Sequence, residues 1–234
     1  QDKSVEHQLS SLARRLHATL VVGVTETISQ TAFRNEVVAF GPDGRLVDRY
    51  EKVHRVPFGE YVPFRGFFSH LANLSAVPRD AVPGTGDGVL HTPAGELGTM
   101  VSYEVFFSDR GRTATRNGAN LLIVPTNTSS YSTGQVPAQE IAAARLQAIA
   151  QGRDLLQAAP TGYSALIENS GRVLARTSLG TRAVLVGNLR LRDGETLYVA
   201  WGDVPVLVVS LVMLLAGWGI SLLRRDERKP YFYS

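Results

Sequence analysis

The sequence predicts an α/β sandwich followed by a membrane-spanning helix. Strand-like and helix-like segments alternate over most of the chain and include two β-hairpins, which is more typical of a sandwich than of a simple doubly wound sheet. No charged residue occurs in the later stretch Val204–Leu223, which is long enough to cross about 30 Å of hydrocarbon. We therefore expect a globular domain over residues 1–200, a transmembrane helix over 204–223 and a basic tail over 224–234.

The N-terminal part contains a helix, a strand and a hairpin. Apolar residues spaced by four and three positions predict an amphipathic helix over residues 4–17. Leu20–Val24 is a short apolar run rich in β-branched residues, which predicts a buried strand. Strand-like runs flank Gly41-Pro-Asp-Gly44, where proline and glycine favour a turn. The same pattern recurs around Asn169-Ser-Gly171 and predicts the second hairpin.

Residues 64–74 are apolar and aromatic without strand alternation, and two interpretations are open. The segment is either part of the core or a lid that dips into a lipid interface, with Phe67, Phe68 and Leu71 as the inserted side chains. Residues 81–96 are rich in glycine and proline and are expected to form a loop.

A second helix is predicted over residues 138–151, after Pro137 and before Gly152. Strand-like runs follow at 183–191 and 196–200. The prediction of this helix is based on four apolar residues that share one face, namely Ala138, Ala142, Leu146 and Ile149.

Composition excludes several classes of function. The 234 residues, 44% of them hydrophobic, can form one domain with a sizeable core. The net charge of +3 owes much to the C-terminal cluster, and no basic patch is interleaved with aromatics, so we expect no nucleic-acid binding. The chain has no cysteine for disulfides or thiolate ligands, and its five histidines lack ligand spacing, so we expect no metal.

Ser102 is the candidate nucleophile. It follows the strand-like run Gly98–Val101 and precedes Tyr103, so its hydroxyl is expected at a sharp turn after a buried strand, rigid and open to substrate. A Ser-His-Asp triad that uses His54 is disfavoured, because no Gly-x-Ser-x-Gly elbow is present.

Three stretches together carry a resemblance to a known family. Tyr50–Phe64, Ser102-Tyr-Glu104 and Leu121–Asn127 occur in this order before a helix and a terminal apolar span. In this the chain resembles the nitrilase-type domain of the apolipoprotein N-acyltransferases, from about Leu20 to Arg225. The resemblance implies a nitrilase-like αββα sandwich and no cofactor.

The same resemblance implies roles for individual residues. Lys52 corresponds to the catalytic lysine that stabilises an oxyanion, Glu60 to the glutamate that supports it, and Ser102 stands where the family has its nucleophilic cysteine. Tyr103 and Glu104 would shape the substrate pocket, although a structural buried ion pair is an open alternative for Glu104.

Further substrate-binding candidates lie outside the elbow. Asn127, at the tip of the Leu121 strand, is a weaker candidate for the pocket, and its alternative role is that of a turn or capping residue. Phe67 and Phe68 are candidates for contact with lipid.

The reaction implied is the transfer of an acyl chain from a membrane phospholipid, through an acyl-enzyme, to the amine of a diacylglyceryl-cysteine at a lipoprotein N-terminus. In the family the base is a glutamate that lies upstream with further membrane helices. We expect this chain to be a fragment, since it begins at Gln1. Lys and Arg are more frequent after the span than before it, which predicts a cytoplasmic C-terminus and an extracytoplasmic domain in a multi-pass protein of the bacterial inner membrane.

Serine at position 102 leaves the activity open, because a hydroxyl is essentially un-ionised at neutral pH and needs stronger activation than a thiol. Three interpretations of this serine are open. The chain is either an engineered variant in which serine replaces cysteine, a natural serine variant, or an inactive homologue, and we favour the first. Two rival functions remain: a membrane-anchored nitrilase-like amidase, and a non-catalytic scaffold of an envelope complex.

Overall fold

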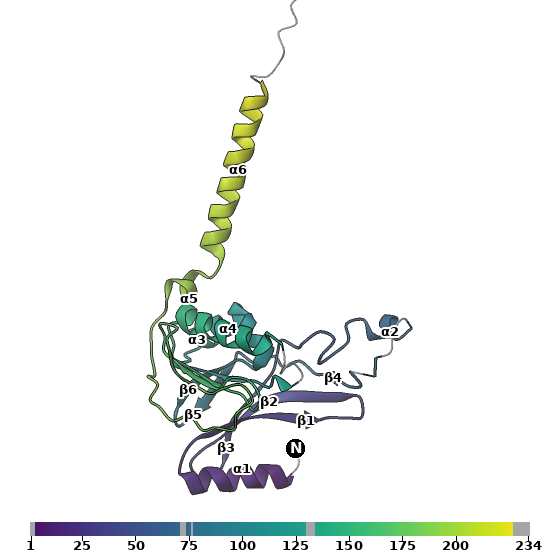
Figure 1. Cartoon of the computed structure of the whole chain (residues 1–234), viewed down its shortest axis with the longest axis vertical. Helices are drawn as coiled ribbons and strands as arrows, with labels where there is room; N and C mark the ends of the chain where they lie inside the picture. Colours follow the sequence, from purple (N-terminus) through teal and green to yellow (C-terminus); the bar gives the residue numbers. More distant parts are fainter. Residues whose placement is uncertain (1–2, 71–73, 76, 130–133, 227–234) are drawn as a thin grey trace, which may run out of the picture.

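The chain folds into four layers, a helix, two β-sheets and a pair of helices, from which one long helix projects (Figure 1). The computed structural model describes residues 3–70, 74–75, 77–129 and 134–226. This is the αββα sandwich that the resemblance implied. The two sheets pack face to face through apolar side chains of both, namely Val37, Ala39, Tyr50, Leu90, Leu97 and Ile123.

The first sheet contains the predicted N-terminal hairpin. Strand β2 pairs antiparallel with β1 and with β3, and the short β4 pairs parallel with β2. Gly44 has a φ of 79° in the turn between β2 and β3, a conformation that favours glycine, so the sequence prediction of this hairpin is confirmed. The strands are β1 (Leu20–Thr27), β2 (Ala32–Phe40), β3 (Leu46–Glu51) and β4 (Asp80–Ala81).

The second sheet has the order β10-β9-β8-β7-β6-β5, with β6, β7 and β8 parallel to one another. The predicted hairpin around Gly171 is confirmed as β9 and β10. The expected loop over 81–96 is confirmed for residues 82–88 and wrong from Val89 on, because Val89 and Leu90 are buried in β5 and the chain turns at Gly95 into β6. The strands are β5 (Val89–Thr92), β6 (Gly95–Thr99), β7 (Leu121–Pro125), β8 (Leu155–Ala158), β9 (Ala165–Ile167) and β10 (Val173–Arg176).

Helices cover both outer faces. Helix α1 (Lys3–Leu16), close to the predicted range, packs Ala13 against the first sheet. Helices α3 (Ser108–Arg116) and α4 (Val136–Gln151) cover the second sheet (Figure 1). Helix α4 ends at Gly152, whose φ is 63°, so its existence and its C-terminus are as predicted.

The buried face of α4 differs from the apolar face by which the helix was identified. Leu146 and Ile149 are 67% and 50% exposed, and Ala138 and Ala142 are exposed too. The interior face combines Ile141, Ala144 and Ala148 with the buried polar residues Glu140, Gln147 and Gln151. Polar groups of α4 therefore reach the inside of the domain.

The aromatic segment after β3 forms an arm (residues 63–70) that projects from the sandwich and contains the one-turn helix α2 (Arg65–Phe68) (Figure 1). Phe64 and Phe67 are 83% and 64% exposed, so the core interpretation is wrong for the described part of this segment. Asp80 accepts a hydrogen bond from Arg65 at 2.5 Å and ties the arm to β4. Leu71 lies outside the described residues.

The segment before the last helix is irregular. Residues 183–191 are not a strand, contrary to the prediction, and residues 196–200 belong largely to helix α5 (Leu197–Trp201). Arg112 of α3 donates from Nε to the Val199 carbonyl at 2.7 Å and from Nη2 to the Ala200 carbonyl at 3.0 Å. These bonds fix α5 to the body of the domain.

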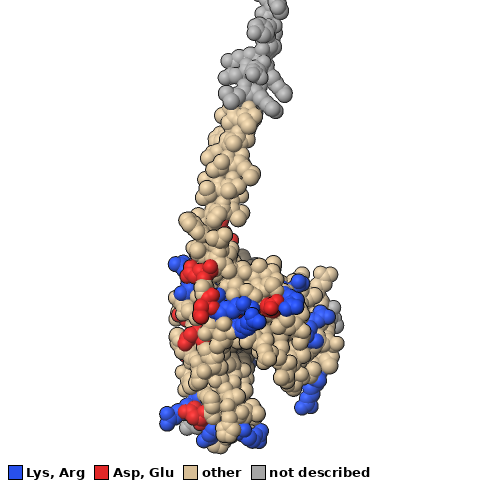
Figure 2. All heavy atoms as spheres, turned by 90° about the vertical axis from the view of Figure 1, so that its left-hand side faces the viewer, with Lys and Arg blue, Asp and Glu red and all other residues tan. Residues whose placement is uncertain are grey.

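Helix α6 (Val204–Asp226) leaves the domain directly after α5. It is long and apolar enough to cross a membrane over Val204–Leu222, and none of that stretch is buried. Charged side chains of both signs lie on the body, whereas the visible face of α6 carries none (Figure 2). The helix extends three residues into the predicted tail, whose remaining residues, 227–234, lie outside the described part.

Candidate active site

Ser102 lies at a strained elbow, as the sequence predicted. Strand β6 ends at Thr99, and Ser102 opens the 3₁₀-helix η1 (Ser102–Phe106) with a φ of 50°. A left-handed conformation costs a non-glycine residue about 1 kcal/mol, so the surrounding contacts must enforce it. The turn presents a half-buried hydroxyl between the second sheet and α4.

Lys52 and Glu60 form a buried pair. Lys52 directly follows β3, is 2% exposed, and places Nζ 2.7 Å from Glu60 Oε1. Asn35 Nδ2 donates to the same oxygen at 2.7 Å, and the Val56 amide donates to Oε2 at 2.8 Å. Glu60 is thus held from two sides and fixes the ammonium group, which suits the supporting role that the resemblance implies.

Glu104 joins the lysine segment to the elbow. Its side chain is fully buried and accepts hydrogen bonds from the Tyr50 hydroxyl at 2.9 Å and from the Val53 and His54 amides at 2.7 and 3.0 Å. The Val101 amide, next to Ser102, donates to its other oxygen at 2.8 Å. These bonds favour a structural role for Glu104, and its contact with substrate stays a prediction.

The structure adds a residue that the sequence analysis missed, Glu140 of α4. Ser102 Oγ donates to Glu140 Oε1 at 3.0 Å, and Thr126 Oγ1 lies 2.9 and 2.8 Å from the two carboxylate oxygens. Burial raises the pKa of Glu140, while the hydroxyls of Thr126 and Ser102 and the charge of Lys52 oppose the rise. A carboxylate therefore contacts the candidate nucleophile directly.

One sequence signal could have revealed Glu140. It is a single acidic residue beside Ile141 in a helix whose polar residues recur at 140, 147 and 151. Because apolar residues also line the outer face, the pattern favoured the wrong side of the helix.

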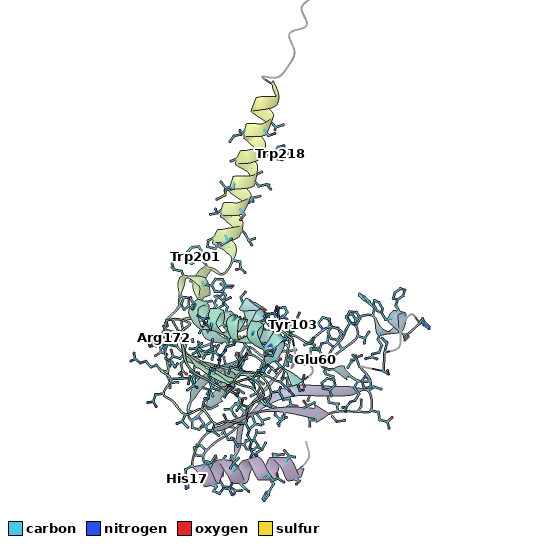
Figure 3. The ribbon with its side chains drawn as sticks, viewed as in Figure 1. His17, Glu60, Tyr103, Arg172, Trp201 and Trp218 are labelled. Carbon is cyan, nitrogen blue, oxygen red and sulfur yellow. The ribbon has the colours of Figure 1, made fainter. Side chains whose placement is uncertain are left out.

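The remaining candidates are spread over the rim of the site. In Figure 3, Tyr103 and Glu60 lie at the edge of the sandwich from which the arm projects. Phe67 and Phe68 lie on the arm with ring centroids 5.4 Å apart. Asn127 is exposed and accepts a hydrogen bond from the Ser129 amide at 3.1 Å, as a turn residue does. Their roles in substrate binding stay predictions.

His54 has partners other than Ser102. Its ring stacks on Phe107 with centroids 4.2 Å apart, and Nε2 lies 3.4 Å from Asp109 Oδ2. The described residues contain no group of three His, Cys, Asp or Glu side chains that could hold a metal ion.

Comparison with other proteins gives a family match over most of the chain and relatives of the same name. The family described as carbon-nitrogen hydrolase matches residues 1–197. The chain is 32% identical over 221 residues to the apolipoprotein N-acyltransferase of Mycolicibacterium smegmatis, covering 92% of this chain and 36% of that protein. It is 32% identical over 200 residues to that of Geobacter metallireducens, covering 84% and 38%. The chain thus spans little more than a third of the length of these relatives.

Solved structures share the fold. A carbon-nitrogen hydrolase from Helicobacter pylori G27 superposes with a TM-score of 0.58 at 23% identity, covering 75% of this chain and 63% of that one. An amidase from Nesterenkonia sp. gives a TM-score of 0.57 at 22% identity, covering 75% of this chain and 63% of that one. These structures share the fold of the sandwich, and the match of the family over residues 1–197 establishes that the chain belongs to the carbon-nitrogen hydrolase family.

Proposed function

We propose that this chain is the catalytic part of an apolipoprotein N-acyltransferase. It would take an acyl chain from a membrane phospholipid and pass it to the amine of a diacylglyceryl-cysteine at a lipoprotein N-terminus. The observation that carries the proposal is the convergence of the Lys52–Glu60 pair and the Ser102 elbow, which Glu104 links by hydrogen bonds to both segments. The names of the curated relatives support the choice of reaction.

The proposed mechanism uses the buried groups in sequence. Ser102 Oγ attacks the ester carbonyl, and an ester-linked acyl-enzyme forms as the lysophospholipid leaves. Lys52 is a cation in a water-poor site, so it stabilises the oxyanion of the tetrahedral intermediate more strongly than it would in water. Glu60 keeps Nζ in position for this role.

The apolar parts of the chain support a membrane location. We infer that α6 crosses the bacterial inner membrane and that the domain lies on its extracytoplasmic side. The greater length of the apolipoprotein N-acyltransferases that the chain resembles supports the further proposal of a multi-pass protein. The exposed aromatic side chains of the arm, Phe64 and Phe67, suit contact with a lipid donor.

The test is covalent trapping in phospholipid-containing micelles, with the protein as Ser102, Ser102→Cys and Ser102→Ala. We expect intact mass to show an added acyl chain on the Ser102 protein or the cysteine variant, released by a diacylglyceryl-cysteine peptide and absent from the alanine variant. If neither the Ser102 protein nor Ser102→Cys forms an acyl adduct although both are folded and bind lipid, the proposal is contradicted, and the non-catalytic scaffold becomes the favoured function. Turnover of small amides without phospholipid would instead favour the amidase.

A further inference from the structure

We propose that the outer face of helix α4 rests on the membrane surface, so that the helix layer of the domain contacts lipid in addition to α6. The inference rests on the membrane span of the proposed function, but it does not depend on the reaction. It adds a second contact with lipid, which a single span does not require. The outer face consists of four exposed apolar residues, namely Ala138, Ala142, Leu146 and Ile149.

This face is unusually apolar for the exposed side of a helix that covers a sheet. Such a helix normally turns its charged and polar residues towards solvent. In α4 the arrangement is reversed, because Leu146 and Ile149 are 67% and 50% exposed whereas Gln147 and Gln151 are buried. Among the exposed residues of α4, all of which the structure describes, Arg145 alone is charged, and anionic lipid headgroups attract a positive charge.

The position of α4 indicates what covers this face. Helices α3 and α4 form the outer layer on the side from which α6 projects, while α1 lies on the opposite side (Figure 1). Helix α4 also runs across the axis of α6 (Figure 1). Transmembrane helices are tilted by only about 20° on average, so a bilayer spanned by α6 extends over the α3–α4 layer. The outer face of α4 is then directed towards lipid.

Helix α5 holds α4 close to the start of the span. Thr196 Oγ1, at the N-cap of α5, donates to the Ala150 carbonyl of α4 at 2.5 Å. Leu197 and Trp201 of α5 are 83% and 62% exposed, and Trp201 lies where α6 begins (Figure 3). Tryptophan is enriched where a span meets water. Apolar surface therefore continues from α6 over α5 to α4, which favours lipid as the occupant of the outer face.

The small size of the outer face also favours lipid over a second copy of the chain. A stable dimer buries about 800 Å² on each partner, and two large apolar side chains, Leu146 and Ile149, are few for such an interface. A weak contact is sufficient for a domain that α6 already holds at the bilayer, because the second contact is then intramolecular.

Spin labels on single cysteines test the contact, because the chain has no cysteine of its own. The protein is placed in nanodiscs of phosphatidylethanolamine and phosphatidylglycerol, with a label on Leu146→Cys or Ile149→Cys. The relaxation of each label by oxygen, which is enriched in lipid, is compared with its relaxation by a nickel chelate, which stays in water. Leu16→Cys, on the far side of the domain, is the control, and Leu211→Cys reports the span itself (Figure 1).

We expect the labels at positions 146 and 149 to lie about 5–10 Å below the headgroup boundary, as on the apolar face of an interfacial helix. The label at position 16 should relax as it does in water. Labels at positions 146 and 149 that are as accessible to the nickel chelate as the label at position 16 overturn the inference.

A second series tests whether the apolar side chains cause the contact. The label is kept on Ala142→Cys, and Leu146→Asp and Ile149→Asp are added together. These charges should remove the label from lipid, whereas Leu174→Asp, a matched change at an exposed leucine of β10, should leave its depth unchanged. All replaced side chains are exposed, so the variants should keep the fold, which circular dichroism checks. An unchanged depth in the double variant contradicts the inference.

The outcomes separate this inference from the proposed function. A label at lipid depth at position 211, with positions 146 and 149 in water, keeps the span and refutes the contact of α4. Spin–spin broadening between copies at position 146, in place of lipid contact, assigns the face to a dimer and also refutes it. Accessibility of position 211 to the nickel chelate refutes both the contact and the membrane location. Lipid depth at positions 146 and 149 in a protein that forms no acyl adduct sustains the contact and refutes the acyltransferase.

Discussion

At the scale of single residues, the site combines a strained serine with carboxylates that differ in role. Ser102 holds a φ of 50°, which glycine would adopt more easily. The four groups that donate to Glu104 lock the chain on either side of the elbow, so the strain persists. Glu104 thus fixes the backbone, Glu60 fixes a cation, and Glu140 contacts the nucleophile.

Another buried carboxylate, Glu36 of β2, should make the stability of the protein depend on pH. It is 1% exposed, with Arg49 and Arg34 at 3.7 and 4.0 Å, and burial together with the neighbouring Glu26 raises its pKa to about 7. Since this pKa exceeds the ordinary 4.5, the contribution of Glu36 to the stability of the folded protein is fully present below pH 4.5 and is lost as the pH rises through 7.

We therefore expect the free energy of unfolding of Glu36→Gln to match that of wild type near pH 5 and to exceed it by roughly 1–3 kcal/mol near pH 8. Urea unfolding at the two pH values measures the difference. Glu168→Gln is the matched control, because hydrogen bonds from Ser170 and Arg172 lower the pKa of Glu168, so its contribution should not change between pH 5 and 8. Parallel pH profiles of wild type and Glu36→Gln would refute the expectation.

At the scale of elements, the arm is an exposed aromatic tip held by a charged base. Phe67 is 64% exposed, and Arg65 pairs with Asp80 where the arm leaves the sandwich. This arrangement presents apolar side chains without burying them in the domain, which is typical of a segment that contacts an interface.

The chain has no cysteine, so a single label at position 67 can report contact of the arm with lipid. We expect a fluorophore on Phe67→Cys to be quenched by brominated lipids, at a depth of about 5–10 Å from the headgroup boundary. Leu16→Cys is the control, because it is exposed on α1, at the end of the molecule farthest from α6 (Figure 1). Equal quenching at both positions, or at neither, would count against a lipid-contacting arm.

The elements also show where sequence patterns were sufficient. Both hairpins were predictable, because glycine and proline at the turns determine the local backbone. The strand predicted over 183–191 was wrong, since Val184 and Val186 are 87% and 90% exposed and find no partner in the described sheets. Alternation indicates a strand only where a neighbouring strand supplies hydrogen bonds.

At the scale of the whole molecule, the sandwich and α6 are separate in packing. The stretch Val204–Leu222 buries nothing against the domain, whereas Val199 of α5 is fully buried. The order of the layers was predictable through family resemblance, but the Ser102–Glu140 contact was not. It depends on which face of α4 turns inward, and that is decided by packing between segments far apart in the sequence.

A chain that ends after Gly202 should therefore keep its thermal stability. We expect its melting temperature to lie within about 2 °C of that of the longer chain, corresponding to well under 1 kcal/mol. Differential scanning fluorimetry provides the measurement. A chain that ends before Thr196 is the control and should melt lower, because it loses Val199 and the partners of Arg112. Equal melting temperatures of the two shortened chains, or an unfolded chain that ends after Gly202, would show that the sandwich does not fold independently of α6.

The bonds from Arg112 to α5 have a consequence for the search for substrates. Only Gly202 and Asp203 separate α5 from α6, so the body cannot swing on a long tether. If α6 spans a bilayer as proposed, this short link keeps the domain, and with it the Ser102 elbow, close to the bilayer surface. Encounters with lipid-borne reactants are then governed by lateral diffusion in two dimensions, and their frequency scales with surface density instead of bulk concentration.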